Sequence, residues 1–390
     1  MVTNLPIKAK LKWAEVEAAK NPSEKIRLMK EFLSLCPKHK GTSRLVAHVK
    51  HQIAVLEDEI LERRRIAKSG GRSRFFVEKA GAAQVVVLGL TGSGRSSLLA
   101  ALTNAKATIG TYPYTTKEPI PGMLSFEDVQ LQLVEVPALM EGSADGKGYG
   151  FQIFSLVRNA DGIIILLDAS KEPLDAYKTV IEELEKARIL VEKPKGRVEI
   201  IRVSHGKDIR LVGNPRLEGC NPEELIRLLK GFGIKSSIVR LQGTVTLEDV
   251  ENALFGNVVY KPTLVLANKM DLPEAQKGYD ELRRTLENTL PILAISCVTR
   301  QGLDQIGPLL FKTLELVRIY TKKPGDRPSS IPLILRAGSS VRDVARLVHT
   351  ELHENFSYAR LWGPNAKYQG ERVGASYIVK DRDVLEIHTR

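Results

Sequence analysis

Short apolar runs alternate with amphipathic stretches through the middle of the chain. The runs have the length and the continuous hydrophobicity of buried strands, and the stretches between them repeat apolar residues every three or four positions, as an α-helix does. We expect strands at 84–88, 129–136, 162–168, 263–267 and 292–296, and helices at 96–104, 149–159, 172–192, 273–288 and 302–319. This alternation predicts an α/β fold with a mostly parallel sheet and helices on both faces.

Two further regions depart from this alternation. Residues 193–258 show short strand patterns at 198–203 and 238–241 and one helix at 222–231, which predicts an inserted α+β subdomain. After a linker near 320–325, the last unit should contain a strand, a helix and a final strand at 331–335, 341–352 and 384–388. Strand, helix and strands in so few residues suggest a small β-grasp fold.

The N-terminal part of the chain carries a helical pattern instead. Apolar residues recur at spacings of three and four over 23–66, and the segment 36–41 interrupts them, so we expect a helical hairpin. The apolar stripe consists of Ile26, Met29, Phe32, Leu33, Val46, Val49, Ile53, Leu56 and Ile60. This seam is too short for a free-standing coiled coil, so the hairpin should fold back on itself or on the next domain. The expected domains are a basic helical hairpin segment at 1–80, an α/β domain at 81–328 and the last unit at 329–390.

Positive charge is concentrated in this N-terminal segment. The whole chain has a net charge of +12, and residues 1–80 alone hold 18 Lys and Arg against 9 Asp and Glu. Six of the cations crowd one short stretch, at Arg63, Arg64, Arg65, Lys68, Arg72 and Arg74. Such a basic arm suits contact with RNA or a ribosome surface, and the alternative is a solvated helix pair that keeps the protein soluble.

No feature of the sequence predicts a membrane or secretory destination. No apolar run approaches the ~20 residues that span a bilayer, and the first residues lack the apolar core and cleavage site of a signal peptide. The three cysteines, Cys36, Cys220 and Cys297, are far apart and odd in number, so neither a disulfide framework nor a zinc site fits them. We expect a cytoplasmic monomer with free thiols and no membrane association.

A glycine-rich turn lies between the first predicted strand of the α/β domain and the helix that follows. Its sequence is Gly89-Leu90-Thr91-Gly92-Ser93-Gly94-Arg95-Ser96. In this setting such a turn binds phosphate, because its backbone N–H groups and the helix N-terminus point at the anion. The expected phosphate contacts are Gly89, Thr91, Gly92, Ser93, Gly94, Arg95, Ser96 and Ser97. Ser96 would also ligate Mg²⁺. Arg95 replaces the usual lysine, which is not a conservative change, and the alternative is an ordinary strand-turn-helix corner.

A second loop has the pattern that reads a guanine base. Asn268, Lys269 and Asp271 follow an apolar strand in the order of an NKxD motif. The Asp271 carboxylate can accept hydrogen bonds from guanine N1–H and the 2-amino group, donors that adenine lacks, so discrimination of roughly 10⁴-fold is attainable. Asn268 would contact the N7 side of the base, and the stem of Lys269 would cover its ring. Ser296 and Cys297, after the next strand, would offer a backbone contact to the guanine oxygen. The alternative is a polar turn in which Asp271 caps the next helix.

The residues between these two loops offer the parts of a nucleotide switch. Thr116, with Thr115 as the second choice, could reach Mg²⁺ and the γ-phosphate; otherwise the pair belongs to a surface strand. Where a DxxG motif is expected, the chain has Glu135 and Ala138. Glu135 could reach Mg²⁺ through water, and Ala138 keeps the N–H for the γ-phosphate although its Cβ restricts the backbone. Leu139 stands where many GTPases have a water-positioning Gln, and Leu cannot orient water.

These motifs, in this order, resemble those of the Obg-like GTPases. The resemblance rests on the P-loop, the Tyr-Pro-Tyr-Thr-Thr segment 112–116, Pro137 followed by Glu141-Gly142, the glycine-rich run 145–150 and the 268–271 motif. It points to the developmentally regulated GTP-binding protein (DRG) branch, covers nearly the whole chain and identifies the last unit as a TGS domain. The fold class that it implies is a P-loop GTPase domain with an N-terminal helical hairpin, an inserted α+β subdomain and a C-terminal β-grasp TGS domain.

The resemblance also implies an activity and partners. It implies a ribosome-associated translational GTPase that turns over slowly, binds GTP or GDP with Mg²⁺ and has an apolar residue in place of the catalytic Gln, as Leu139 is here. Ribosomal RNA or tRNA would be the partner, with a regulatory protein as a further partner of the hairpin or the TGS domain. The chain departs from the family at Arg95, Glu135 and Ala138, which all act on Mg²⁺ or the β- and γ-phosphates. Some relatives that lack the Gln hold K⁺ with a P-loop Asn; Gly92 stands at that position, which argues against a potassium site.

Three functions fit these residues. The first is a guanine-nucleotide switch, a slow GTPase that acts on the ribosome or its RNA. The second is a nucleotide-binding scaffold that does not hydrolyse GTP and binds RNA or ribosomes. The third is an ATPase or a nucleotide-free adaptor, which equal affinity for GDP and ATP would support. Four arginines of the TGS domain are contact candidates against a background of ordinary surface charge: Arg336, Arg342, Arg346 and Arg360.

Overall fold

The computed structural model describes most of the chain in two compact units. The described residues are 5–19, 21–37, 45–46, 49–50, 52–54, 56–57, 60, 75–103, 118–202, 208–232, 234, 236–254 and 258–389. The first unit is built from residues 1–76, 137–159 and 177–261, and the second from 77–136, 160–176 and 262–390. Each unit therefore combines stretches that are far apart in the sequence. Within the described residues, no helix is long and apolar enough to cross a bilayer.

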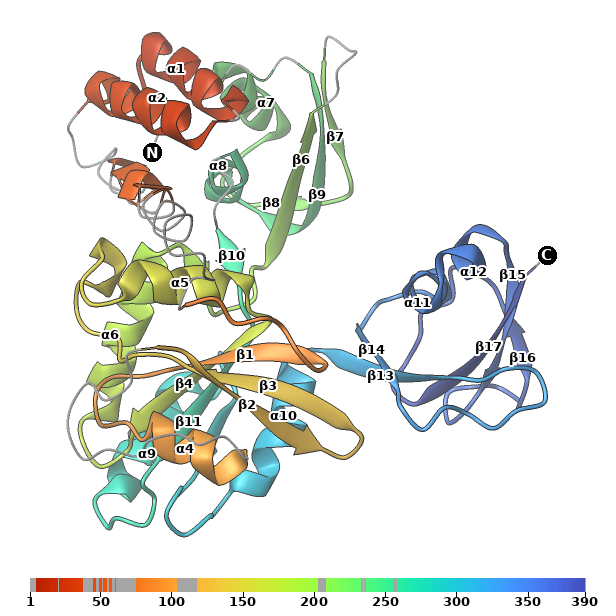
Figure 1. The fold of residues 1–390 in the computed structure, drawn as a ribbon. Helices are drawn as coiled ribbons and strands as arrows, with labels where there is room; N and C mark the ends of the chain where they lie inside the picture. The colour runs from red at the N-terminus through yellow and green to blue at the C-terminus, as the bar shows by residue number, and fades with distance from the viewer. Residues whose placement is uncertain are drawn as a thin grey trace. The chain divides into compact units, whose positions relative to one another are not determined.

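A six-stranded sheet forms the centre of the second unit (Figure 1). Its strands, in spatial order, are β12 (Ile292–Ala294), β11 (Thr263–Asn268), β4 (Gly162–Asp168), β1 (Ala83–Leu88), β3 (Val129–Glu135) and β2 (Ile120–Phe126). All neighbours are parallel except β2 and β3. Every residue of β1 and β11 is buried, so both faces of the sheet are covered. The mostly parallel α/β sheet predicted from the sequence is confirmed.

The strand β2 has no counterpart among the predicted strands. Its sequence contains a proline and a glycine, and five of its seven residues are not buried. Both properties are typical of an edge strand, where a missing backbone donor is tolerated. Because the strand lacks a continuous apolar run, only its antiparallel pairing with β3 identifies it.

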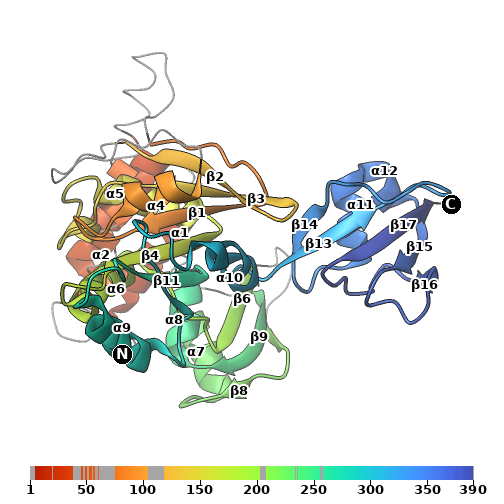
Figure 2. The ribbon, with the colours of Figure 1, turned by 90° about the horizontal axis from the view of Figure 1, so that it is seen from below.

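Three helices of this unit follow its strands: α4 (Arg95–Leu102), α9 (Ala275–Leu286) and α10 (Ile306–Thr313). Leu98 and Leu99 of α4 share one hydrophobic core with Leu310 of α10 and with the sheet, and both helices lie along the sheet in Figure 2. The predicted helix at 302–319 is wrong in its second half. The helix ends at Thr313, and β13 (Leu316–Thr321) begins after Glu315, whose φ of 51° belongs to the left-handed region.

The C-terminal domain is a five-stranded sheet with two helices. Its order is β14 (Leu333–Arg336), β13, β17 (Asp383–Thr389), β15 (Phe356–Trp362) and β16 (Glu371–Val373), with β13 and β17 parallel and the other pairs antiparallel. The helices α11 (Val341–Val348) and α12 (Thr350–Glu354) replace the single helix expected at 341–352, because His349 has an extended backbone. The sheet begins at Leu316, ahead of the boundary expected at 329, because the sequence pattern predicts a helix over these residues.

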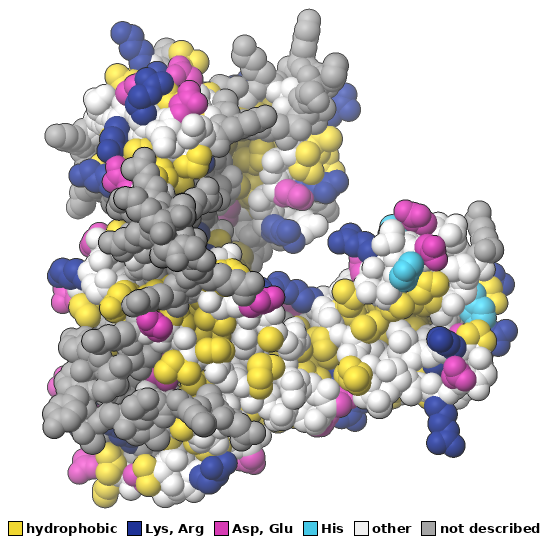
Figure 3. Space-filling view, in the orientation of Figure 1, with side chains coloured by type: hydrophobic (Ala, Val, Ile, Leu, Met, Phe, Trp, Pro, Cys, Tyr) yellow, Lys and Arg dark blue, Asp and Glu magenta, His cyan; other side chains and the backbone are white. Residues whose placement is uncertain are grey.

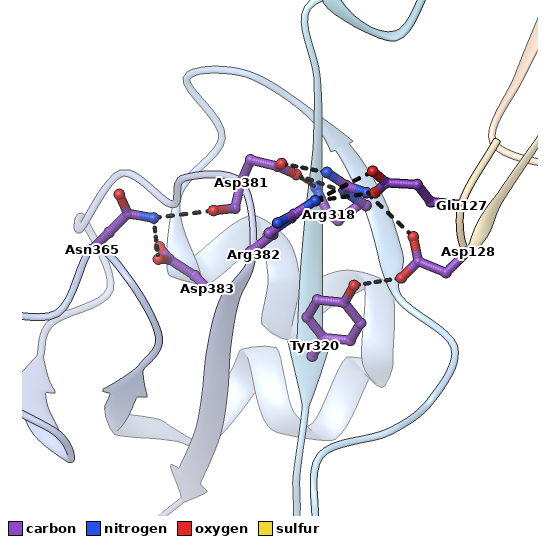
Figure 4. A network of polar contacts seen from close by, with 8 residues as sticks. All are labelled: Glu127, Asp128, Arg318, Tyr320, Asn365, Asp381, Arg382 and Asp383. Carbon is purple, nitrogen blue, oxygen red and sulfur yellow. Dashed lines mark hydrogen bonds and ion pairs between the residues drawn. The ribbon is translucent and has the colours of Figure 1, made fainter. Parts of the chain in front are cut away.

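One buried arginine joins this C-terminal sheet to the turn between β2 and β3 (Figure 4). The side chain of Arg318 on β13 is only 6% exposed. Its guanidinium donates two hydrogen bonds to Asp381, of 3.1 and 2.7 Å, pairs with Glu127 and lies 3.4 Å from Asp128. Tyr320 donates to Asp128 as well. These carboxylates, Asp381 foremost, outweigh burial and raise the pKa of Arg318, so the guanidinium is a fixed positive charge at this joint.

The first unit contains the inserted α+β subdomain expected from the sequence. Its strands are β6 (Gly196–Arg202), β7 (Ile209–Val212), β8 (Arg216–Leu217) and β9 (Ser237–Val245), and β9 pairs with the other three. Its helices are α7 (Pro222–Gly231) and α8 (Leu247–Leu254). A capping box between Asn221 and Glu224 starts α7.

Two further helices contribute to the first unit. They are α5 (Gly150–Asn159) and, from residue 177 onward, α6 (Pro173–Lys186). The helix predicted at 172–192 is too long, because Arg188 has a φ of 59° and the short strand β5 (Ile189–Leu190) pairs with β10 (Val259–Tyr260).

The N-terminal helices pack onto this inserted subdomain. The helices α1 (Ile7–Ala18) and α2 (Pro22–Leu35) contribute Trp13 and Phe32, whose ring centroids lie 4.9 Å apart. Both belong to one buried cluster with Leu225 and Leu229 of α7. The helix α1 was not predicted, and the basic cluster at 63–74 lies outside the described residues. On the face shown in Figure 3, the Lys and Arg side chains of described residues are spread among acidic ones.

Candidate nucleotide-binding site

The glycine-rich turn has the strand-turn-helix setting of a P-loop. It follows β1, ends on Gly94 as the N-cap of α4, and bends through left-handed glycines, with φ of 83° at Gly92 and 96° at Gly94. A Cβ added at Gly94 would lie 2.4 Å from the side-chain nitrogen of Asn268. Only glycine fits at this position, because both the backbone conformation and the close approach of Asn268 exclude a side chain.

Arg95 folds back over the turn that precedes it. Its Nη1 donates to the carbonyl oxygens of Gly89 and Leu90, at 2.5 and 2.6 Å, and lies 3.3 Å from Ser93 Oγ. Its Nε has no hydrogen-bond partner among the described residues. Burial lowers the pKa of Arg95, and the negative charge of Glu135 opposes that shift. A phosphate oxygen would therefore compete with two backbone carbonyls for this guanidinium.

Two oxygen-bearing side chains meet at the start of α4. The Ser96 hydroxyl donates to Glu135 Oε1 at 2.5 Å, and Glu135 is fully buried at the end of β3. Mg²⁺ prefers hard oxygen ligands of this kind, so the pair fits the cation that accompanies a nucleotide phosphate. The third predicted Mg²⁺ ligand, Thr116, and its alternative Thr115 lie outside the described residues.

Asn268 ties the P-loop to the loop after β12. Its Nδ2 donates to the carbonyl of Ser93 at 2.9 Å, and its Oδ1 accepts the backbone N–H of Cys297 at 3.3 Å. The side chain is 2% exposed. Both ends of the amide thus connect two loops. A buried amide is satisfied by such fixed partners.

Lys269 is held by an acidic residue that lies outside the predicted motifs. Its backbone lies in the left-handed region, with a φ of 69°, and its Nζ lies 2.5 Å from Asp168 Oδ2. Burial would raise the pKa of Asp168, but the bonds from Lys269 and Ser170 outweigh burial and lower it. The carboxylate is therefore ionised and fixes the lysine stem. The available signal was that Asp168 is the acidic end of a buried apolar strand.

Asp271 is oriented by Ser296. The Ser296 hydroxyl lies 2.6 Å from Asp271 Oδ1, and its oxygen accepts the backbone N–H groups of Val298 and Thr299 at 3.2 and 3.1 Å. Asp271 is exposed, whereas Ser296 is fully buried. Burial raises the pKa of the neighbouring Cys297 thiol to about 11. The structure thus brings a carboxylate, a lysine stem and the backbone of 296–298 around one end of the sheet, at the carboxyl ends of β11 and β12.

The two remaining switch candidates, Ala138 and Leu139, belong to the first unit. Ala138 and Leu139 are both buried, Leu139 being 1% exposed. The glycine-rich segment that follows is a tight turn with left-handed backbone at Gly142, Gly146 and Gly148. The four arginines proposed in the C-terminal domain are exposed, and one of them, Arg336, lies 3.5 Å from an acidic side chain of its own unit.

Three protein-family models match consecutive parts of the chain. Residues 84–196 match the model of the 50S ribosome-binding GTPase family, residues 207–316 match the C-terminal region of that GTPase domain, and residues 317–389 match the TGS domain.

Similar proteins are found in archaea and in animals. A GTP-binding protein of Halobacterium salinarum, described as uncharacterized, is 33% identical over 94% of this chain and 99% of its own length. Developmentally-regulated GTP-binding protein 2 of Mus musculus is 31% identical over 93% of this chain and 98% of its own length. Among solved structures, a GTP-binding protein from Pyrococcus horikoshii covers 79% of this chain and 100% of its own at 14% identity, with a TM-score of 0.43.

Proposed function

Because the chain belongs to the developmentally regulated GTP-binding proteins of the Obg-like GTPases, we propose that it is a slow GTPase switch acting on the ribosome or its RNA. One observation carries the nucleotide part of this proposal. The base-reading residues and the phosphate loop are joined by the buried amide of Asn268, so one rigid site presents both to a single ligand. The ribosome part rests on the family and on the basic cluster at 63–74.

Guanine would be selected by Asp271. Ser296 holds one oxygen of its carboxylate, and the other can accept the N1–H and 2-amino donors of guanine. The Asp168–Lys269 pair keeps the lysine stem in place over the ring. Adenine presents no donors to this carboxylate and would leave it unsatisfied, which costs binding free energy.

The phosphates would lie over the P-loop and the N-terminus of α4. Its backbone N–H groups and Arg95 neutralise the β- and γ-phosphates. Ser96 would hold Mg²⁺ directly and Glu135 through water, with Thr116 as a further ligand. The cation, when bound, offsets negative charge on the β- and γ-oxygens. The N–H of Ala138 would sense the third phosphate.

Slow hydrolysis follows from the residue at position 139. A buried leucine offers no donor or acceptor to an attacking water, so only charge neutralisation and positioning remain to speed the reaction. Arg95, Glu135 and Ala138 each alter a contact to the cation or the phosphates. We therefore expect single-turnover rates far below those of GTPases with a water-positioning glutamine.

Single-turnover phosphate release from GTP tests the enzymatic part. Purified protein in excess over radiolabelled GTP should release phosphate above a protein-free background, with and without ribosomes. The matched control is Asp280→Asn, an exposed carboxylate on α9 that should leave the rate unchanged. If no phosphate is released with or without ribosomes, the proposed GTPase activity is refuted. GDP binding measured in parallel shows whether the nucleotide site is intact.

A non-hydrolysing scaffold is the second candidate, and the position of Arg95 favours it. The guanidinium donates hydrogen bonds to the carbonyl oxygens of Gly89 and Leu90, and these bonds must break before it can bind a phosphate. The triple change Arg95→Lys, Glu135→Asp and Ala138→Gly would then switch hydrolysis on. If the triple variant is no faster than the wild type, these positions do not limit hydrolysis and this candidate loses its basis.

Docking on the ribosome is tested by co-sedimentation in the nucleotide-free, GDP and GTP-analogue states. The GTP-analogue state should sediment with ribosomes most strongly, and replacement of Arg63, Arg64 and Arg65 by alanine should weaken it. Alanine at Arg283 and Arg284, an exposed basic pair on α9, is the matched control. Equal sedimentation of all three states would contradict a nucleotide-controlled switch.

A further inference from the structure

One buried carboxylate holds residues 140–150, the segment that follows Glu135 and Ala138, which we call the second switch. Glu183 of α6 is 1% exposed, and its two oxygens accept the backbone N–H groups of Gly142 and Ala144 at 3.1 and 2.6 Å. The ammonium group of Lys186 lies 2.9 Å from the same carboxylate. All four residues belong to the first unit. A buried carboxylate is costly unless its lone pairs are satisfied, and here three donors satisfy it.

The segment itself is folded into one tight conformation. Ser143 Oγ accepts the N–H of Met140 at 3.0 Å, and the N–H of Lys147 donates to the carbonyl of Gly142 at 3.1 Å. A Cβ at Gly150 would lie 1.8 Å from the carbonyl oxygen of Ser143. This geometry directs the N–H groups of residues 142 and 144 to the same carboxylate. If the segment unfolded, the buried carboxylate of Glu183 would lose both backbone donors and, among the described residues, keep only its ion pair with Lys186.

We propose that Glu183 is a positioning residue that keeps residues 140–150 folded in every nucleotide state. The inference rests on the proposed switch function and narrows it. The glycine-rich run after the second switch is then a fixed block, although such a run suggests a mobile hinge. The response to the third phosphate is left to residues 135–139, which precede the block, and to the predicted switch residue Thr116.

Hydrogen exchange of the segment tests the proposal directly. In the wild type, amides of residues 140–150 should exchange at the same rate, within about twofold, in the nucleotide-free, GDP-bound and GTP-analogue-bound protein. Glu183→Gln has the same shape but loses the charge and turns an amide N–H₂ toward a backbone donor. Exchange of the segment should then become about tenfold faster or more. Glu182→Gln, an exposed neighbour on α6, is the matched control and should stay within twofold of the wild type.

Nucleotide affinity tests whether the segment is coupled to the third phosphate. A segment that is folded in every nucleotide state opens independently of that phosphate, so Glu183→Gln should change the affinities for a GTP analogue and for GDP by the same factor, within about twofold. Glu183→Asp, which keeps the charge on a shorter stem, should recover part of the lost exchange protection. Lys186→Gln, at a half-exposed cation, leaves the carboxylate and its backbone bonds in place and should change exchange only about threefold.

Two results would overturn the proposal. One is wild-type exchange at 140–150 that slows strongly when the GTP analogue replaces GDP, which is the signature of an ordering transition. The other is a Glu183→Gln protein in which the amides of residues 140–150 exchange at the wild-type rate. A wild-type protein that does not bind GDP would refute the proposed function. Exchange of the wild type and of Glu183→Gln could still be compared in the nucleotide-free state, so the two failures are distinguishable. Should Glu183→Gln fail to fold, Lys186→Gln and Glu183→Asp carry the test.

Discussion

Replacing Asp271 by asparagine is expected to move the base preference from guanine to xanthine. Ser296 determines which atom of residue 271 faces the base. Its oxygen accepts the N–H groups of Val298 and Thr299, so its single proton goes to Asp271 Oδ1 at 2.6 Å. In Asp271→Asn, only the amide oxygen can accept that proton. The amide nitrogen therefore takes the outer position and presents N–H groups where guanine also has donors.

The size of the effect follows from two lost hydrogen bonds. A hydrogen bond to a charged group contributes about 1.5–3 kcal/mol, so two correspond to about 3–6 kcal/mol. That range equals roughly 10²- to 10⁴-fold in Kd. Because Asp271 is exposed, water competes for its carboxylate, and the lower end, about 10²-fold weaker GDP binding, is the expected value. Xanthine carries a carbonyl at C2 that accepts from the new amide, so xanthosine diphosphate should bind more tightly than GDP.

The assay is titration of fluorescent GDP and xanthosine diphosphate at fixed salt and Mg²⁺. Adding Ser296→Ala to Asp271→Asn removes the hydroxyl that orients the amide of Asn at position 271. The amide can then rotate by 180°, so the preference for xanthine should decrease. Asp280→Asn is the matched control and should keep the wild-type preference for GDP. If Asp271→Asn binds GDP with an affinity within threefold of the wild type, the carboxylate of Asp271 does not recognise the guanine base.

Three further outcomes are expected. Arg318→Met removes the cation that pairs with Glu127 and Asp381 and should lower the free energy of unfolding by about 2–4 kcal/mol, measured by urea unfolding. This is somewhat less than for a fully buried ion pair, because both carboxylates are partly exposed. Gly94→Ala forces a Cβ onto Asn268 and a left-handed backbone on alanine, so GDP binding should be lost while circular dichroism stays near wild type. The folded pKa of Asp168 lies below its unfolded value, so its pairing with Lys269 stabilises above about pH 4 and is lost as pH falls further. The stability gap between wild type and Asp168→Asn should thus shrink from pH 7 to pH 3.

Much of the local structure can be predicted from short stretches of sequence. The strand Gly162–Asp168 and the helix Pro222–Gly231 occur where the pattern placed them, since a continuous apolar run and a capped amphipathic helix are recognisable without their neighbours. The opposite case is Leu316–Thr321. Its residues suit a helix or a strand equally, and its partners β14 and β17 decide the outcome.

The sequence by itself predicted which loops of this protein bind a nucleotide, because that chemistry depends on residue types at fixed local spacing. It did not determine what holds those loops. The bond from Asn268 to Ser93 spans 175 positions, and the bond from Glu183 to Gly142 spans 41. Whether such groups meet depends on how strands order in the sheet and how helices pack. The tertiary structure alone therefore decided that Asn268 joins loops, that Asp168 fixes Lys269 and that Glu183 clamps the segment after the second switch.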